Sequence, residues 1–337
     1  MKPHIVLLPS NRLQKSGAPP PRFGIAEAFE RQGFSAEVLD VNESPRNPFA
    51  GCVSLFASVD PWRAAKILFG RRKAYAVVSY YQSGALLILA LRRLLGFKPL
   101  VVIVDVGDDS NWPLRARIVA FCLKRADAVF SFASDQTAYL ARRYPGARVQ
   151  FLPQQIDTAF FTPAEGDGSY ILSVGNDLSR DYDTLLEAVR DLDVPLKLRT
   201  DCVPPRPGLT IAPRGDDEAL RALYRAAKIV GLPLHDMRHP GGISSLFEAF
   251  ACGKAVVASD ARGIRDYLQH EENCLVVPSG DVAALRAAVL RLLQDEGLRL
   301  RLGKAARRYA ETELSQDRYA ARLKNAFAAL RPFPTIV

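Results

Sequence analysis

Residues 231–281 read GLPLHDMRHPGGISSLFEAFACGKAVVASDARGIRDYLQHEENCLVVPSGD, and this stretch says most about the fold. An apolar run predicts a strand, a loop with Gly241 and Gly242 follows, and a helix is predicted to begin around Ser244 or Ser245. The first N–H groups of a helix have no acceptor within it and lie at the positive end of its dipole, so they attract anions. The two glycines let a ligand approach the backbone closely. The stretch therefore predicts an anion-binding loop between a strand and a helix.

Glu248 lies one helical turn beyond the two serines, on the same predicted face. A diphosphate at the helix start would bring an attached ribose near this carboxylate, which can accept hydrogen bonds from both ribose hydroxyls. The spacing Ser245-x-x-Glu248 is also that of a capping box, in which the two side chains only complete the hydrogen bonds of a helix start. Spacing alone leaves both interpretations open.

Outward from this stretch, apolar β-type runs alternate with helical patterns along the chain, which is typical of parallel sheets covered by helices. In the first half, strands are predicted over 4–8, 36–41, 74–80, 99–106, 127–133 and 149–153, and helices over 23–33, 83–95, 113–125 and 135–144. Segment 154–168 has the composition of a linker. In the second half, strands are predicted over 170–175, 195–200, 209–213, 228–234, 254–259 and 273–278, and helices over 181–192, 216–227, 244–252, 262–269 and 281–293, before a helical tail to about 330.

The length of 337 residues predicts two α/β domains, and the net charge of +9 is unevenly divided between them. Residues 1–165 hold 21 Lys and Arg against 13 Asp and Glu, a balance of +8, which leaves +1 for the rest. The basic residues include a run without any acidic residue, namely Arg63, Lys66, Arg71, Arg72 and Lys73. This run is either a solvated face or a surface for an anionic partner such as a membrane or a lipid diphosphate. Nucleic acid ranks last, because aromatic residues do not interleave the charges as stacking platforms would and no signature of a nucleic-acid-binding module is present.

The sequence shows no pattern expected of a membrane span, a signal peptide or a metal site. The longest apolar stretch, Ala85–Leu91, is far below the ~20 residues of a membrane span, and the opening apolar run is too short for a signal peptide. Five scattered cysteines lack metal or redox spacing and predict reduced, buried thiols in a cytoplasmic protein. His235 and His239 imitate a zinc-protease motif, but their expected place in a loop argues against a metal site.

Residues 241–259, Gly-Gly-Ile-Ser-Ser-Leu-Phe-Glu-Ala-Phe-Ala-Cys-Gly-Lys-Ala-Val-Val-Ala-Ser, resemble the C-terminal hallmark of the retaining glycosyltransferase group 1 family. There a Glu-Gly-Phe-Gly-type loop leads into Leu-Glu-Ala-Met-Ala-x-Gly-x-Pro-Val-Val-Ala-Ser. The resemblance implies the α/β fold called GT-B, in which two Rossmann-like domains have parallel sheets facing a central cleft and a C-terminal helix crosses back. It implies an acceptor domain over 1–160, a nucleotide-sugar donor domain over 161–310, and a tail over 311–337 that packs on the first domain.

The same resemblance implies roles for individual residues. Glu248 would bind the donor ribose, Arg180 would neutralise the donor phosphates, and Asp105 would stand where the family often has a histidine near the reacting carbon. Among the donor contacts, Gly175 would permit a close turn and Arg214 would read the base. The full set of implied donor-binding residues is Gly175, Asn176, Arg214, His239, Gly242, Ile243, Ser244, Ser245 and Glu248.

Three departures from the family pattern bear on activity. Pro240 occupies the place of the first of two family glutamates, so the carboxylate near the sugar is absent. Asn176 or Asp177 stands where an arginine is expected after Gly175. Asp105 has either replaced the histidine or belongs to a different acceptor pocket, and an acidic loop that only caps the next helix is an equal alternative.

The expected reaction moves a sugar from a nucleoside diphosphate sugar to an acceptor hydroxyl with retention, in the assembly of a cell-surface polysaccharide or glycolipid. No cofactor and no metal are expected, and the acceptor is a sugar or a lipid-linked molecule. The expected location is the cytoplasm, with contact at the inner face of an anionic membrane. The alternatives are a catalytically idle GT-B protein that binds a lipid or partner, and a nucleotide-sugar epimerase. A nicotinamide dehydrogenase is excluded because neither half opens with Gly-x-Gly-x-x-Gly after its first strand.

Overall fold

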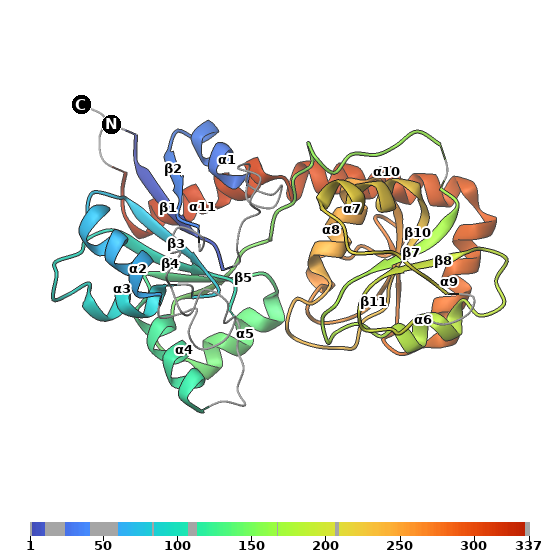
Figure 1. The fold of residues 1–337 in the computed structure, drawn as a ribbon, viewed down its shortest axis with the longest axis horizontal. Coiled ribbons are helices and arrows are strands. Elements are labelled where there is room, and N and C mark those ends of the chain that lie inside the picture. Colours follow the sequence, from blue (N-terminus) through green and yellow to red (C-terminus); the bar gives the residue numbers. More distant parts are fainter. Residues whose placement is uncertain are drawn as a thin grey trace. The chain divides into compact units, whose positions relative to one another are not determined.

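The structure is a computed structural model that describes residues 2–10, 24–40, 60–82, 84–106, 113–166, 168–205 and 209–333. Its contacts divide the chain into two units (Figure 1). The N-terminal unit comprises Met1–Pro153 together with Tyr319–Val337, and the C-terminal unit comprises Gln154–Arg318. The division therefore falls between Pro153 and Gln154 and again within the last helix.

The N-terminal unit is built on a six-stranded, all-parallel sheet with the order β2-β1-β3-β4-β5-β6. Its central strands are apolar on both faces, because helices cover both sides of a parallel sheet. The strands are β1 (His4–Leu8), β2 (Ser35–Val38), β3 (Ala76–Tyr80), β4 (Leu100–Val104), β5 (Ala128–Ser131) and β6 (Val149–Phe151). The helices are α1 (Ile25–Arg31), α2 (Pro61–Ala65), a π-helical turn (Lys66–Gly70), α3 (Ala85–Leu91), α4 (Pro113–Arg125) and α5 (Ser134–Arg143).

The final helix, α11 (Gln316–Leu330), belongs to the N-terminal unit from Tyr319 onward. Phe327 is fully buried there, in ring contact with Phe29, Phe34 and Tyr75. The Tyr75 hydroxyl donates to the Phe327 carbonyl at 3.2 Å. The prediction of a C-terminal helix that packs back on the first domain is confirmed.

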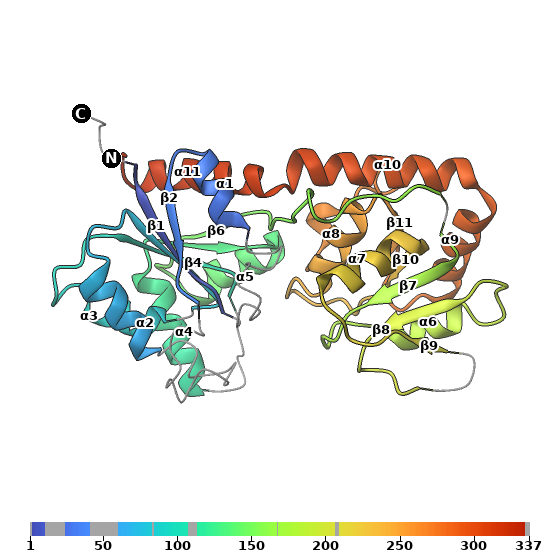
Figure 2. The ribbon, with the colours of Figure 1, turned by 45° about the horizontal axis from the view of Figure 1, so that its top comes forward.

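The C-terminal unit has a second six-stranded parallel sheet, with the order β12-β11-β10-β7-β8-β9. Helix α10 covers α8 and β11 (Figure 2). The strands are β7 (Tyr170–Val174), β8 (Leu196–Arg199), β9 (Thr210–Ile211), β10 (Ala227–Leu232), β11 (Ala255–Ser259) and β12 (Leu275–Val277). The helices are α6 (Tyr182–Ala188), α7 (Asp217–Ala226), α8 (Ile243–Ala251), a 3₁₀ turn (Arg265–Tyr267), α9 (Val282–Gln294) and α10 (Glu296–Glu313).

Several sequence predictions need correction. The helix predicted over 262–269 is only the 3₁₀ turn Arg265–Tyr267. The charged helical tail predicted after residue 293 is divided at Leu314 and Ser315 into α10 and α11, and the Asp295 carboxylate caps α10 by accepting from the Leu298 amide at 2.8 Å. The segment predicted as a linker packs on the C-terminal unit, since the Ile156 amide donates to the Leu314 carbonyl at 2.8 Å. Cys202 is exposed, whereas Cys122, Cys252 and Cys274 are buried as predicted and Cys52 lies outside the described residues.

The basic run 63–73 is not a uniform solvated face. Arg63 is 1% exposed and forms an ion pair with the buried Asp60 at 2.5 Å. Arg71 donates two hydrogen bonds to Glu37, at 2.7 and 2.6 Å, and Arg72 donates to the Leu95 carbonyl. Three of the five basic side chains therefore serve the internal structure of the N-terminal unit. In the parts of the chain that the structure describes, none of the helices has the length and apolar content needed to cross a bilayer.

Candidate functional site

The site is centred on the start of α8, where the chain turns from β10 into a helix. Gly242 is the N-cap residue, and its φ of 85° lies in the left-handed region that glycine adopts without strain. No side chain caps the helix, which begins at Ile243, one or two residues earlier than predicted. The first-turn N–H groups, including those of Ser244 and Ser245, have no acceptor within the helix. The positive end of the α8 dipole therefore lies at a loop without a side-chain cap.

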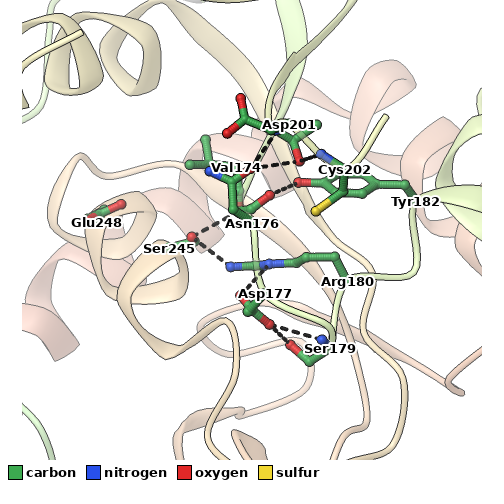
Figure 3. A network of polar contacts seen from close by, with 12 residues as sticks. Val174, Asn176, Asp177, Ser179, Arg180, Tyr182, Asp201, Cys202, Ser245 and Glu248 are labelled. Atoms are coloured by element: carbon green, nitrogen blue, oxygen red, sulfur yellow. Dashed lines mark hydrogen bonds and ion pairs between the residues drawn. The ribbon is translucent and has the colours of Figure 1, made fainter. Parts of the chain in front are cut away.

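Arg180 lies against this helix start. Its side chain is only 3% exposed, and its Nη2 donates to Ser245 Oγ at 3.0 Å while its Nε donates to Asp177 Oδ2 at 3.1 Å (Figure 3). Its Nη1 is buried and has no hydrogen-bond partner among the described residues. A Cβ placed on Gly242 would be 3.2 Å from Nη1, which puts this donor beside the N-cap of α8. A buried, unsatisfied cationic donor at a helix N-terminus is the arrangement expected of an anion site.

The backbone around Arg180 explains why the guanidinium occupies this place. Gly175 has a φ of 149°, and a Cβ there would overlap the guanidinium, so the arginine passes directly over the glycine. The loop after β7 is joined to the continuation of β10, because the Asp181 amide donates to the Pro233 carbonyl at 3.1 Å and the His235 amide donates to the Ser179 carbonyl at 2.8 Å. These bonds hold the two loops together with Arg180 between them.

Ser245 and Glu248 do not form a capping box. Ser245 Oγ accepts from Arg180 and donates to the Val174 carbonyl at 3.0 Å, so it links β7, the Arg180 loop and α8. Glu248 is 3% exposed, and its Oε2 accepts a hydrogen bond of 2.9 Å from the Tyr224 hydroxyl of α7. Burial and the charge of Glu248 raise the pKa of Tyr224 well above its ordinary value, which keeps its hydroxyl protonated as a donor. The capping-box interpretation is therefore wrong for this serine and this glutamate.

A second group of predicted residues meets at the end of β8. Asn176 Oδ1 accepts from the Thr200 hydroxyl at 3.1 Å and from the Asp201 amide at 2.6 Å. Arg214 is exposed and forms an ion pair with the Asp201 carboxylate. The structure thus brings Asn176 and Arg214 together through Asp201, at the outer end of the loop that begins at Gly175.

Two other predicted residues, His239 and Asp105, belong to neither of these groups of contacts. The His239 side chain is exposed, and its carbonyl accepts from the Gly241 amide at 2.7 Å. Asp105 belongs to the N-terminal unit, where it follows β4, is 4% exposed and has a φ of 59°. That φ is uncommon for a residue with a Cβ, and its amide donates to the Phe130 carbonyl at 2.8 Å. Residues 107–112 of the acidic loop lie outside the described part of the chain.

Sequence reasoning missed three side chains of the site. Asp177 contacts both Arg180 and Ser179, and Tyr224 contacts Glu248. Asp177 and Ser179 precede Arg180 in one short loop, so their proximity was a usable signal. Tyr224 is 24 residues from Glu248, and nothing in the sequence pattern indicated that pairing.

Residues 155–309 match the family of glycosyl transferases group 1. The C-terminal unit is a group 1 glycosyltransferase domain. Over 113 residues the chain is 37% identical to a D-inositol 3-phosphate glycosyltransferase of Salinispora arenicola, a match that spans 34% of this chain and 24% of that protein. Over 72 residues it is 40% identical to the amylovoran biosynthesis glycosyltransferase AmsK of Erwinia amylovora, which spans 21% and 18% of the two chains. The matches thus cover about a quarter or less of these relatives.

Solved structures resemble this chain over nearly its whole length. Sucrose-phosphate synthase from Thermosynechococcus elongatus superposes with a TM-score of 0.73 at 19% identity, covering 98% of this chain and 99% of that one. Anabaena HepE in complex with UDP gives a TM-score of 0.66 at 12% identity, covering 98% and 100%. At these identities the likeness concerns the fold, and it confirms the predicted GT-B architecture.

Proposed function

We propose that this group 1 chain transfers a sugar from a nucleoside diphosphate sugar to an acceptor hydroxyl, with retention of anomeric configuration. The observation that carries the proposal is the buried Nη1 of Arg180, which has no partner among the described residues and lies beside the N-cap of α8. A dianionic diphosphate would satisfy this donor and the first-turn N–H groups of α8 together.

The chemistry of such a reaction asks for stabilisation of the leaving diphosphate. Negative charge grows on the phosphate as the glycosidic bond breaks, and fixed donors aimed at that charge lower the barrier without having to reorganise. Arg180 is held by Asp177 and Ser245, so its guanidinium is already oriented before the donor arrives. In the proposed pose Glu248 binds the ribose, and Asn176 and Arg214 lie toward the base. In the same proposal Asp105 of the N-terminal unit has a catalytic role, and neither a metal nor a cofactor takes part.

A thermal-shift panel of UDP, GDP, ADP and dTDP tests the donor site. A nucleotide at one hundred times its Kd should stabilise the chain by ~2.7 kcal/mol. The matching nucleotide sugar, offered with simple glycosides as acceptors, should then give a product whose anomeric configuration is read by NMR. The rate should be unchanged by EDTA. No stabilisation by any of the four nucleotides would contradict the proposal.

The same experiment separates the two alternatives. Nucleotide binding without transfer to any acceptor would favour a catalytically idle protein. Pro240 is the reason to test this alternative, because it stands in place of the first family glutamate. Conversion of the nucleotide sugar into an epimer without an acceptor would favour an epimerase. The names of the relatives, which include amylovoran biosynthesis and lipopolysaccharide core biosynthesis, favour transfer to a cell-surface polysaccharide or glycolipid.

We also propose a peripheral contact of the N-terminal unit with an anionic membrane at the cytoplasmic face. Two neighbouring pockets, of about 520 and 850 Å³, lie where the strands of its parallel sheet begin. Eleven lysines and arginines line them against one carboxylate, Asp127, which is paired with Arg92 at 3.0 Å. Phe69 and Leu94 on this edge are 66% and 82% exposed. Basic residues beside exposed apolar ones suit a bilayer with anionic headgroups.

Flotation with vesicles tests this contact. Lys73 and Lys98 are exposed on the basic edge, whereas Arg71 and Arg72 are engaged within the unit and are poor choices for charge reversal. Lys73→Glu with Lys98→Glu should weaken binding to phosphatidylserine vesicles at least tenfold, since each basic residue near such a surface contributes about 1 kcal/mol. The matched control reverses Lys304 and Arg308, which are exposed on α10. Wild-type protein that ignores these vesicles at low salt would rule the contact out.

A further inference from the structure

The carboxylate of Asp177 has an unexpected place for an acidic group, because it lies within the anion site. Its Oδ2 accepts from Arg180 Nε at 3.1 Å, and its Oδ1 accepts from the Ser179 amide at 3.1 Å and from the Ser179 hydroxyl. The side chain is nevertheless 41% exposed. Although burial would raise the pKa of Asp177, the charge of Arg180 and the Ser179 hydrogen bonds outweigh this and lower it, so the group is ionised at neutral pH.

The hydrogen bonds leave this carboxylate with capacity for another donor. An ionised carboxylate offers about four acceptor positions, two on each oxygen. Ser179 occupies both positions of Oδ1, and Arg180 occupies one of Oδ2. One position on Oδ2 remains, on a side chain that solvent reaches.

The carboxylate also lies against the loop that leads into α8. A Cβ placed on Gly241 would be 2.9 Å from Asp177 Oδ1, so the acidic group is next to the backbone just before the N-cap. The carboxylate that this loop itself carries, Asp236, is engaged by Arg262, whose Nε donates to it at 3.0 Å. Asp177 is therefore the half-exposed carboxylate that faces the α8 start.

A negative group here is costly if the ligand is only a phosphate. The like charges of a carboxylate and a nearby phosphate repel each other, although Arg180 offsets part of this repulsion. A carboxylate in such a place is compensated when the ligand also carries hydroxyl groups, since hydrogen bonds from hydroxyls to an ionised acceptor are short and strong. The arrangement thus favours a ligand whose phosphate is joined to a polyol.

We propose that Asp177 accepts a hydrogen bond from a hydroxyl of the donor's sugar, and so makes the site prefer the nucleotide sugar over the nucleoside diphosphate. The proposal rests on the proposed function of the site and adds to it a residue that determines specificity for the sugar end. Ser179 and Arg180 then have a second task, which is to hold the carboxylate in one orientation.

Isothermal titration calorimetry of the full chain with UDP and with UDP-glucose measures the two dissociation constants. If the guanine nucleotide is the one that stabilises the chain, GDP and GDP-mannose take their place. In Asp177→Ala the ratio of the two dissociation constants should move at least tenfold against the nucleotide sugar. Asp177→Asn keeps the shape of the side chain and serves as the second variant if the alanine variant folds poorly. It should move the ratio in the same direction. Asp183→Asn removes an equal charge from an exposed position on α6 and should leave the ratio unchanged.

A merely structural role would give a different result. If Asp177 only orients Arg180, both ligands should weaken by the same factor in each variant, and an unchanged ratio would overturn the inference. This outcome differs from a failure of the proposed function, in which the wild-type chain itself would bind neither the nucleoside diphosphate nor its sugar ester.

Discussion

Arg180 receives support from three residues of the C-terminal unit, two in its own loop and one in α8, and each contact limits where its guanidinium can go. Asp177 binds one edge, Ser245 binds another, and Gly175 lies beneath it. The remaining donor, Nη1, has no partner among the described residues and is the group that we propose contacts the ligand. At the scale of single residues, this separates groups that hold the arginine from groups that the ligand would touch.

Replacing Arg180 by methionine should therefore lower kcat/KM for sugar transfer by tenfold or more, each tenfold being ~1.4 kcal/mol of transition-state stabilisation. The fall in kcat/KM is measured by steady-state kinetics, with the donor that the nucleotide panel identifies. Arg190→Met, which changes an exposed arginine nearby, is the matched control. A variant with the wild-type rate would show that the guanidinium does not contact the leaving group.

Gly175→Ala tests the position of the Arg180 guanidinium independently. A Cβ at this position would overlap the guanidinium and displace it, although the mutation leaves Arg180 itself in the sequence. We expect nucleotide affinity to fall as far as in Arg180→Met. An alanine variant that binds nucleotide normally would mean that the position of Arg180 over Gly175 is not needed for binding.

Glu248→Gln tests the ribose contact separately from the buried contact with Tyr224. The glutamine can still accept from the Tyr224 hydroxyl, so folding stability should change little, whereas nucleotide affinity should fall by roughly 1.5–3 kcal/mol, the range for hydrogen bonds to a charged group. Tyr224→Phe is the companion variant, which removes only the hydroxyl. Loss of stability with intact nucleotide affinity in Glu248→Gln would assign Glu248 a structural role alone.

At the scale of elements, the site is made by two loops that meet at their glycines. The loop after β7 packs on Gly241, where a Cβ would overlap the Ser179 side chain. The loop before α8 turns at Gly242 with a left-handed φ. Both loops follow the carboxyl ends of adjacent strands, β7 and β10, which is where ligands bind in parallel α/β sheets.

Gly241→Ala should therefore destabilise the C-terminal unit by about 1–3 kcal/mol, the usual cost of an added methyl group in a packed place. Nucleotide binding should weaken with it, because the Arg180 loop must move. Urea unfolding with and without nucleotide measures both effects. Gly70→Ala is the control, since a Cβ there would have no neighbour within 4 Å, and equal stability of the two variants would contradict the packing argument.

At the scale of the whole molecule, each unit has its own hydrophobic core on its own sheet. The last helix, α11, nevertheless contributes to the N-terminal unit, because Phe327 packs against the rings of Phe29 in α1, Phe34 just before β2 and Tyr75 just before β3. The two loops that we propose bind the nucleotide, after β7 and before α8, lie in the other unit.

Phe327→Ala should destabilise the N-terminal unit by about 3–5 kcal/mol, the usual cost of removing a buried phenylalanine. Hydrogen exchange resolved by peptide should show faster exchange in β1, β2 and β3, while nucleotide affinity stays within twofold. Phe69→Ala, at an exposed position, is the control. Equal loss of protection in both units would show that they unfold together.

The sequence by itself determined the parallel α/β class of both halves, the glycine loop before α8 and the return of the last helix. These features depend on local periodicity, on glycines at turns and on a motif contained in one continuous stretch. The boundaries shifted by one to a few residues, and the helix predicted over 262–269 shortened to a single turn, because helical periodicity does not reveal where tertiary contacts replace it.

Only the tertiary structure decided which side chains meet. Ser245 binds Arg180, 65 residues earlier, and the Val174 carbonyl, 71 residues earlier, instead of capping its own helix. Glu248 pairs with Tyr224 from a different helix, and Asp177 comes to lie beside Gly241 from another loop. A spacing such as Ser-x-x-Glu specifies the face of a helix but not the segment packed against it. That segment is chosen by how the strands order themselves in the sheet, which depends on the burial of the whole chain.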